Sequence, residues 1–215
     1  MEIHVLSQSH SLINQFISEL RDVHMQKDRM RFRKNIERIG QIMAYEVSKT
    51  LTYTKRNVIT PLGTHQSDVL AEQPVLATIL RAGLSMHLGV LNYFDQADCA
   101  FISAFRKHQT GNQFEIVVEY LASPDLTGKT LFLIDPMLAT GQSIDLTYQA
   151  ILQHGTPSKL HILSLLASQD GIDYLSNRLP HATCWIGDLD PELNKDSYIL
   201  PGLGDAGDLS FGEKL

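Results

Sequence analysis

The first fifty residues carry apolar side chains at helical spacing. Residues 12–20 and 36–47 each place apolar positions three and four residues apart, which is the period of one helix face. We therefore expect two helices, joined near residues 26–29. A basic run, residues 27–34, lies at this junction. We expect it to be a solvated helix face or a subunit contact, with a phosphate-binding arm as the alternative.

After a proline and a glycine at residues 61–63, short apolar runs alternate with helical segments. We expect strands at residues 75–80, 99–105, 114–121, 131–135, 160–167 and 183–186, and helices at residues 85–94, 143–153 and 172–178. Several runs are apolar throughout, which is typical of strands covered on both faces. The pattern predicts an α/β fold with a mostly parallel, doubly wound sheet flanked by helices. Ligands of such sheets bind beyond the carboxyl ends of the strands.

The length of the chain fits one domain, because 215 residues can be arranged around a single core. We expect a single domain over residues 1–215. In this prediction residues 1–60 form an N-terminal helical arm, and residues 61–215 form the sheet core with the C-terminal segment.

Charge and cysteine content narrow the functional classes. The chain has 18 Lys and Arg against 24 Asp and Glu, a net charge of −6, so nucleic acid is not an expected partner. Its two cysteines, Cys99 and Cys184, are too few for a disulfide framework or a four-ligand zinc site. We expect a cytoplasmic protein that is not membrane-bound, because the sequence has neither a signal-like start nor the ~18 continuous apolar residues of a membrane span.

The segment of residues 131–143 carries the clearest chemical signal. It reads as a buried strand that ends in Asp135, a loop with Thr140 and Gly141, and a helix that starts at Ser143. Such a junction directs backbone N–H groups and the positive end of the helix dipole at one point, which suits a phosphate. The alternative is an ordinary strand–turn–helix in which Ser143 is an N-cap. The chain has neither G-x-x-x-x-G-K-[ST] nor G-x-G-x-x-G, which argues against nucleoside triphosphatases and dinucleotide-binding enzymes.

Three ordered motifs resemble one family. Residues 135–143, Asp-Pro-Met-Leu-Ala-Thr-Gly-Gln-Ser, resemble the motif with which type I phosphoribosyltransferases bind 5-phosphoribosyl-1-diphosphate (PRPP), in the form found in uracil phosphoribosyltransferases. Residues 79–84 resemble the pyrophosphate loop of that family. Residues 198–208, here called the base segment, resemble its uracil-binding segment. Weaker similarity at residues 31–33, 45–46 and 105–106 extends the match over nearly the whole chain.

The resemblance implies the type I phosphoribosyltransferase fold, with N-terminal helices and a C-terminal base-binding hood. It also implies the reaction uracil + PRPP → UMP + pyrophosphate. The catalytic residues would be Arg81, Arg106, Asp135 and Asp205. The PRPP-binding residues would be Arg81, Arg106, Asp135, Pro136, Met137, Leu138, Ala139, Thr140, Gly141, Gln142, Ser143 and Asp205. Uracil would be bound by Ile199, Gly204, Asp205 and Ala206, largely through main-chain groups.

Within that set the resemblance gives each part a task. Residues 139–143 would hold the 5′-phosphate, and Asp135 would bind the ribose hydroxyls. Arg81 would meet the pyrophosphate, and Arg106 would reach it from a mobile loop. Mg²⁺ is the implied cofactor, held mainly by PRPP and water with Asp205 as the candidate protein ligand. We also expect the N-terminal helices to help form a homodimer.

The sequence departs from the family pattern at a few positions. Gln142 replaces a glycine of the phosphate motif, and residues 107–109 are Lys-His-Gln where acidic residues commonly follow. These departures leave open a regulator that binds PRPP or a nucleotide with little turnover. A transferase for a different base is the other alternative.

Overall fold

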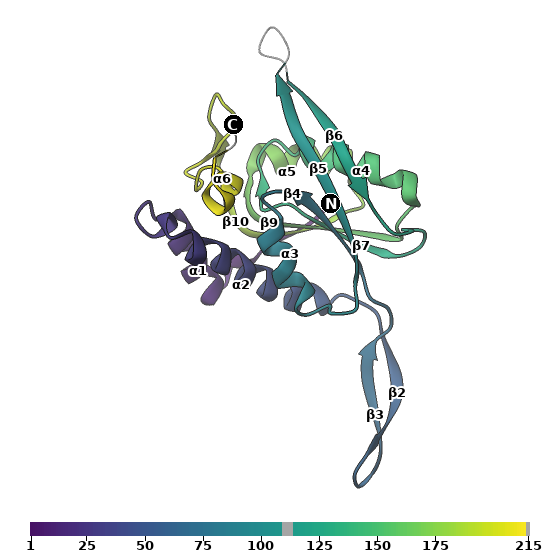
Figure 1. Cartoon of the computed structure of the whole chain (residues 1–215). Coiled ribbons are helices and arrows are strands. Elements are labelled where there is room, and N and C mark those ends of the chain that lie inside the picture. Colours follow the sequence, from purple (N-terminus) through teal and green to yellow (C-terminus); the bar gives the residue numbers. More distant parts are fainter. Residues whose placement is uncertain (109–113, 214–215) are drawn as a thin grey trace.

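A mixed sheet forms the centre of the protein. The computed structural model describes residues 1–108 and 114–213. The strand order is β1-β10-β9-β7-β4-β5-β6, with β8 paired to β9 (Figure 1). All pairs are parallel except β5 with β6. The strands are β1 Glu2–Val5, β4 Val75–Leu80, β5 Asp98–His108, β6 Phe114–Ala122, β7 Thr130–Ile134, β8 Met137–Leu138, β9 Lys159–Ser168 and β10 Thr183–Asp190. The mostly parallel sheet that the sequence predicts is confirmed.

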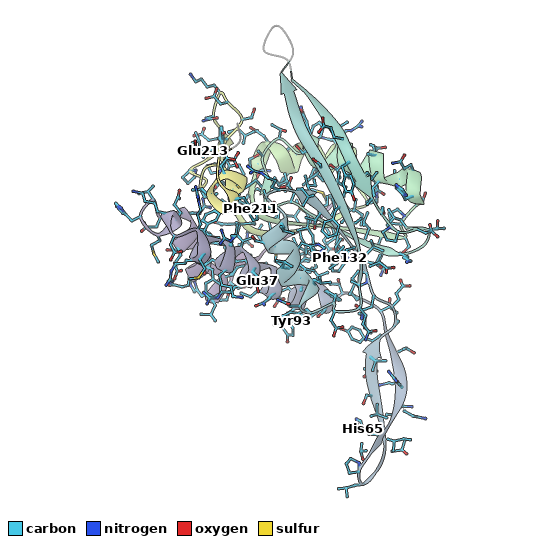
Figure 2. All side chains as sticks on the ribbon, viewed as in Figure 1. Glu37, His65, Tyr93, Phe132, Phe211 and Glu213 are labelled. Atoms are coloured by element: carbon cyan, nitrogen blue, oxygen red, sulfur yellow. The ribbon has the colours of Figure 1, made fainter. Side chains whose placement is uncertain are left out.

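Helices cover both faces of this sheet. They are α1 Leu12–Arg21, α2 Arg29–Ser48, α3 Leu84–Leu91, α4 Gln142–Ile151, α5 Gln169–Arg178 and α6 Ala206–Phe211, with short 3-10 turns at Leu6–Gln8, Met25–Lys27 and Leu152–His154. Side chains of β7 alternate between two cores. Phe132 and Ile134 pack with α1, α2 and α3, whereas Leu131 and Leu133 pack with α4 and α5. Figure 2 labels Phe132 inside the layered body of the protein.

The two N-terminal helices begin at side-chain caps. The Ile13 amide donates to Ser11 Oγ at 3.3 Å at the start of α1, and the Arg31 amide donates to Asp28 Oδ1 at 3.0 Å at the start of α2. The basic run of residues 27–34 is therefore the beginning of α2. Arg33 of this run donates to the Ser210 carbonyl at 2.8 Å, so part of the run supports the C-terminal helix α6.

The prediction of a purely helical arm over residues 1–60 is wrong in two places. The N-terminal strand β1 joins the main sheet beside β10, where Ile3 is in register with Cys184. Residues 53–70 form an antiparallel hairpin, β2 Tyr53–Thr60 and β3 Gly63–Leu70, and residues 61–63 belong to its turn and not to a boundary. The hairpin projects from the body, as His65 shows in Figure 2, and β2 is exposed along its length. A ribbon without a buried face has no apolar alternation to reveal it.

The C-terminal part returns to the carboxyl end of the sheet. A short antiparallel pair, β11 Glu192–Leu193 and β12 Ile199–Leu200, precedes α6. Within the described residues, no helix combines the length and apolar character that crossing a membrane requires.

Candidate active site

Two motif loops lie side by side at the carboxyl ends of β4 and β7. These strands are parallel neighbours, and Thr78 is in register with Ile134. Arg81 follows β4 directly, and Asp135 follows β7. The loops are in contact, because a Cβ atom added to Gly83 would lie 3.1 Å from the carbonyl oxygen of Ile134. The two motifs therefore meet at one edge of the sheet, as a parallel arrangement predicts.

Hydrogen bonds to β9 fix the loop after β7. Asp135 is 9% exposed, and its Oδ1 accepts a hydrogen bond from the backbone amide two residues ahead at 3.3 Å. The Leu138 amide donates to Ser164 Oγ at 3.1 Å. Ser168 Oγ donates to the Ala139 carbonyl at 2.6 Å. The loop thus presents a backbone of defined shape at the start of α4.

We call residues 135–143 the phosphate cradle, and they end in the first turn of α4. The helix begins at Gln142, after Gly141 in a left-handed conformation (φ +75°), and the cap residue Gly141 has no side chain that could accept from the amides of the first turn. Ser143 lies inside the first turn, so the alternative in which it is the N-cap is wrong. The uncapped amides and the helix dipole favour an anion at this end.

The cradle lines a small open hollow. The residues that border it are Asp135, Met137, Leu138, Ala139, Thr140, Gly141, Ser143 and Ile144. Two expected PRPP-binding residues, Pro136 and Gln142, are not among the described residues that border it, and Pro136 is buried. The Gln142 amide instead lies 3.4 Å from Thr140 Oγ1.

Asp145 places a carboxylate in the first turn of α4, and side chains of α5 compensate its charge. The residue is buried, and its Oδ2 accepts hydrogen bonds from Tyr174 at 2.9 Å and from Arg178 Nε at 2.8 Å. Burial raises the pKa of Tyr174, and the bond to Asp145 adds to the rise. Tyr174 therefore stays a neutral donor near neutral pH, and Asp145 ties the helix that begins at the cradle to its neighbour.

The pyrophosphate loop connects the cradle with the C-terminal helix. Arg81 Nη2 donates to Asp208 Oδ1 at 2.9 Å and to the Gly212 carbonyl at 3.1 Å. A Cβ atom added to Gly207 would lie 3.8 Å from Ala82 Cβ, so α6 starts against this loop. The third motif thus adjoins the pyrophosphate loop, which in turn contacts the loop after β7.

The base segment is a tight, glycine-containing turn. Ile199 is buried and paired with Leu193, and Ala206 is 1% exposed. Gly204 has φ +97°, a value that favours glycine, and it is exposed. Asp205 is the N-cap of α6, and its Oδ1 accepts from the Asp208 amide at 2.9 Å.

The comparisons agree with this geometry. The family model "Uracil phosphoribosyltransferase" matches residues 6–213. A uracil phosphoribosyltransferase of Porphyromonas gingivalis is 53% identical over 216 residues and covers 100% of both chains. The chain belongs to the uracil phosphoribosyltransferase family. A uracil phosphoribosyltransferase of Pyrococcus furiosus is 34% identical over 206 residues, covering 94% of this chain and 87% of the relative.

Solved structures support the family fold. The AQ2163 protein of Aquifex aeolicus superimposes with a TM-score of 0.87 at 30% identity and covers 98% of both chains. A purine phosphoribosyltransferase of Pyrococcus horikoshii has a TM-score of 0.51 at 11% identity, covering 74% of this chain and 84% of its own, which shows the fold alone. The expected type I phosphoribosyltransferase fold is thereby confirmed.

Arg106 lies in a different element from the one that the family resemblance implies. We expected it in a mobile loop, but it belongs to strand β5 and is in register with Ile116 of β6. That expectation is wrong for the residue itself, since antiparallel pairing continues past it to His108. Its side chain lies outside the described part of the structure, as do residues 109–113.

Three side chains near the site were missed by the sequence analysis. Asp208 pairs with Arg81, while Arg21 and Asp190 contact the base segment at Gly202. A weak signal was available for Asp190, because it lies four positions beyond the expected strand of residues 183–186, on the side of its carboxyl end. Arg21 had none, since a single basic residue at the end of an amphipathic helix is ordinary.

Behind the pyrophosphate loop lies a neutral histidine. His87 Nδ1 and Thr78 Oγ1 are 2.7 Å apart in the buried contact between α3 and β4. Burial lowers the pKa of His87. The imidazole thus adds no positive charge near neutral pH, which leaves Arg81 as the cation contributed by this loop.

Within residues 1–108 and 114–213, no three side chains of His, Cys, Asp or Glu gather into a metal site. Asp135 and Asp205 provide carboxylate oxygens in this region, and one or two carboxylates beside waters and substrate oxygens are a donor set that fits Mg²⁺.

Proposed function

We propose that the protein transfers the phosphoribosyl group of PRPP to uracil, forming UMP and pyrophosphate. The observation that carries this proposal is the meeting of three segments at one edge of the sheet. These are the phosphate cradle, the pyrophosphate loop with Arg81, and the base segment. In the reaction a uracil nitrogen displaces pyrophosphate at the anomeric carbon of the ribose. The nitrogen loses its proton to solvent water as the new N–C bond forms and the bond to pyrophosphate breaks.

The cradle would hold the 5′-phosphoribosyl part. Amides of residues 139–143 and the hydroxyls of Thr140 and Ser143 offer donors to the 5′-phosphate, at the end of α4 that favours an anion. The Asp135 carboxylate, at the border of the same hollow, would accept hydrogen bonds from the ribose hydroxyls. Both contacts orient the anomeric carbon, and such positioning provides a large part of the rate enhancement in a displacement of this type.

Arg81 would stabilise the pyrophosphate as it leaves. Its guanidinium pairs two oxygens in one plane and stays charged at any working pH. Negative charge that grows on the leaving group is stabilised most by donors that are already in place. Arg106 belongs to the same proposal, as a second cation for the pyrophosphate.

The main chain of the base segment would form hydrogen bonds with the polar edge of uracil. Main-chain groups of Ile199 and of residues 204–206 can complement a carbonyl, an imide N–H and a second carbonyl. Cytosine would place an amino group against a main-chain donor, and an unpaired buried polar group costs ~1–3 kcal/mol. Uracil is therefore the proposed base.

Mg²⁺ would be held by PRPP and water, with Asp205 as the protein carboxylate of the site. When bound, the ion neutralises part of the pyrophosphate charge. Asp205 also caps α6, so the carboxylate that would approach the ion keeps the helix start in place.

A homodimer in the cytoplasm completes the proposal. The hairpin offers apolar surface for a second copy, because Ile59 is 89% and Leu62 99% exposed. The N-terminal helices were expected at this interface, and we extend it to the hairpin. Sedimentation that finds only monomer at assay concentration would contradict the dimer. Cys99 and Cys184 are free thiols, as a reducing compartment requires.

The decisive test is an assay of the purified protein with PRPP, Mg²⁺ and one base at a time. We expect UMP and pyrophosphate from uracil, and no product from cytosine, orotate or purines. Product from another base would identify a different transferase. Thermal stabilisation by PRPP without product would identify a regulator, the alternative that Gln142 raises.

A further inference from the structure

Arg21 joins the end of α1 to the end of β10. Its guanidinium meets Asp190 through two hydrogen bonds, from Nη1 to Oδ2 and from Nη2 to Oδ1, both 2.8 Å. Nη2 also lies 2.8 Å from Asp188 Oδ2. The Asp190 side chain is 6% exposed and the Arg21 side chain 21%. A paired, planar contact of this kind holds both partners in one orientation.

The same two side chains form hydrogen bonds with the main chain of the base segment. Arg21 Nη1 donates to the Gly202 carbonyl at 3.0 Å, and the Gly202 amide donates to Asp190 Oδ2 at 3.0 Å. Both polar groups of Gly202 are therefore satisfied by one ion pair. Gly202 is itself buried.

Gly202 occupies a position that no other residue fits without strain. Its φ is +57°, and a Cβ atom added to it would lie 2.1 Å from the carbonyl oxygen of Ile199. The turn thus folds back on Ile199 and leads into Gly204, two residues of the proposed uracil site. A shift of Gly202 moves both.

Recognition of a ligand by main-chain groups depends on the exact position of the backbone. Its donors and acceptors cannot rotate to recover a lost hydrogen bond, so recognition depends on whatever holds the backbone in place. A binding constellation has to be held to within ~0.5 Å by its supporting residues. Around Gly202 that support comes from Arg21 and Asp190.

We propose that Arg21 and Asp190 are positioning residues that set the affinity for uracil and its discrimination from cytosine. The inference rests on the proposed transferase function and concerns the base alone, since the pair contacts neither the phosphate cradle nor Arg81 in the described structure. Burial alone would lower the pKa of Arg21, but its hydrogen bonds to Asp190 and Asp188 outweigh burial and raise it. The Arg21 guanidinium therefore stays charged in any assay buffer.

The test compares two substrates in the full-length protein. Arg21→Lys keeps the charge but loses the planar, paired contact, and Asp190→Asn removes the charge that Arg21 meets. For each we expect the KM for uracil to rise about tenfold, the loss of one charge-assisted hydrogen bond, while the KM for PRPP stays within about twofold. The ratio of kcat/KM for uracil to that for cytosine should fall as well.

Lys129→Met is the control. It removes an ion pair at the amino ends of β5 and β7, in which Lys129 Nζ lies 3.0 Å from Asp98 Oδ2, at the opposite end of these strands from the motif loops. We expect both KM values of this variant to remain those of the wild type. Thermal unfolding of all variants reports whether they fold.

The outcomes separate the inference from the function. Folded Arg21→Lys and Asp190→Asn proteins with an unchanged KM for uracil would overturn the inference and leave the function intact. An equal rise of both KM values would also overturn it, since a general loss of structure affects both substrates. If neither variant folds, Asp188→Asn is the deciding variant. It removes a carboxylate partner of Arg21 and leaves both residues that bond to Gly202 unchanged. Its KM for uracil should rise about threefold, and an unchanged value overturns the inference. A wild type that makes no UMP refutes the function, and the inference with it.

Discussion

Arg81 forms an ion pair with Asp208, with 2.9 Å between Nη2 and Oδ1, and so links the pyrophosphate loop to helix α6. The two side chains are 41% and 30% exposed, so the pair is partly open to solvent. Pyrophosphate would compete with Asp208 for the same guanidinium. Asp208→Asn is therefore expected to lower the KM for PRPP by about two- to fivefold, in keeping with the ~0.5–1 kcal/mol of an exposed pair. Steady-state kinetics with varied PRPP measures this.

Removal of the Arg81 guanidinium should weaken the binding of PRPP. Arg81→Ala is expected to raise the KM for PRPP or lower kcat by at least about tenfold while the protein stays folded. Glu46→Gln serves as a control, since it breaks an exposed pair with Lys49 on α2. A raised KM for PRPP in Asp208→Asn would mean that Asp208 orients Arg81 for the substrate.

Asp135→Asn tests the ribose contact. The asparagine keeps an oxygen that can accept the 3.3 Å hydrogen bond from the Met137 amide. It loses the charge that strengthens hydrogen bonds to the ribose hydroxyls. We expect kcat/KM for PRPP to fall about 10- to 100-fold. The free energy of unfolding should change by less than about 1 kcal/mol. Wild-type kinetics in this variant would refute the assignment of Asp135.

Gly141→Ala tests the cradle, and Gly128→Ala is its matched control. Both glycines have left-handed φ values, +75° and +73°. A Cβ atom at Gly141 would lie 3.0 Å from the Gly171 carbonyl oxygen and from two side chains of α5, whereas at Gly128 no described atom lies within 4 Å. Each variant should lose about 1–2 kcal/mol of stability through backbone strain.

Only Gly141→Ala should affect the substrate. We expect its KM for PRPP to rise about tenfold or more, because the cradle amides must shift to admit the methyl group. Urea unfolding and steady-state kinetics on both variants separate strain from loss of binding. Equal KM values would show that the cradle does not bind PRPP.

His161 should make the fold sensitive to acid. It packs between Phe132 and Trp185, and its Nδ1 accepts a hydrogen bond from Trp185 Nε1 at 3.2 Å. Burial, followed by the charges of Lys159 and His4, lowers its pKa from 6.5 to about 4. Between these values the unfolded chain binds a proton that the folded protein does not. Stability is therefore full above pH 6.5 and falls as the pH drops toward 4, by roughly 3 kcal/mol in total.

His161→Asn removes this proton and keeps an acceptor for Trp185. The difference in urea midpoint between pH 7 and pH 4.5 should shrink by an amount that corresponds to roughly 2–3 kcal/mol. Between pH 7 and pH 8 the two proteins should show the same slope. The buried His87, whose pKa is also lowered, contributes equally to both. An unchanged acid response would show that His161 is protonated in the folded state.

The sequence was sufficient where local pattern and parallel topology determine the structure. The apolar run before Asp135 predicted β7 as a buried strand, and alternation with helices predicted a mostly parallel sheet, in which the residues after β4 and β7 lie at one edge. The helix start at Gln142 was misplaced by one residue, because the left-handed Gly141 takes the cap position that Ser143 was expected to hold.

Other features had no local signature. The exposed hairpin and strand β1 bury too little on one face to show a periodic pattern. The pairing that includes Arg106 depends on β6, which follows on the chain but gives no sign of its register. Contacts such as Arg81 with Asp208 join residues 127 positions apart, and no spacing rule connects side chains at that distance.

The hydrogen bonds of Arg21 and Asp190 to Gly202 also imply an order in which parts of the protein unfold. Arg21 and Gly202 are 181 positions apart, whereas the bonds that shape the loop after β7 join residues 2 to 29 positions apart. Contacts that close long stretches of chain cost more entropy and open in separate local units. Under mild denaturant we expect amide exchange to begin around residues 199–206, while the hydrogen-bonded amides of Met137 and Leu138 in the loop after β7 stay protected. The protein would then lose affinity for the base at a lower denaturant concentration than it loses affinity for the sugar phosphate.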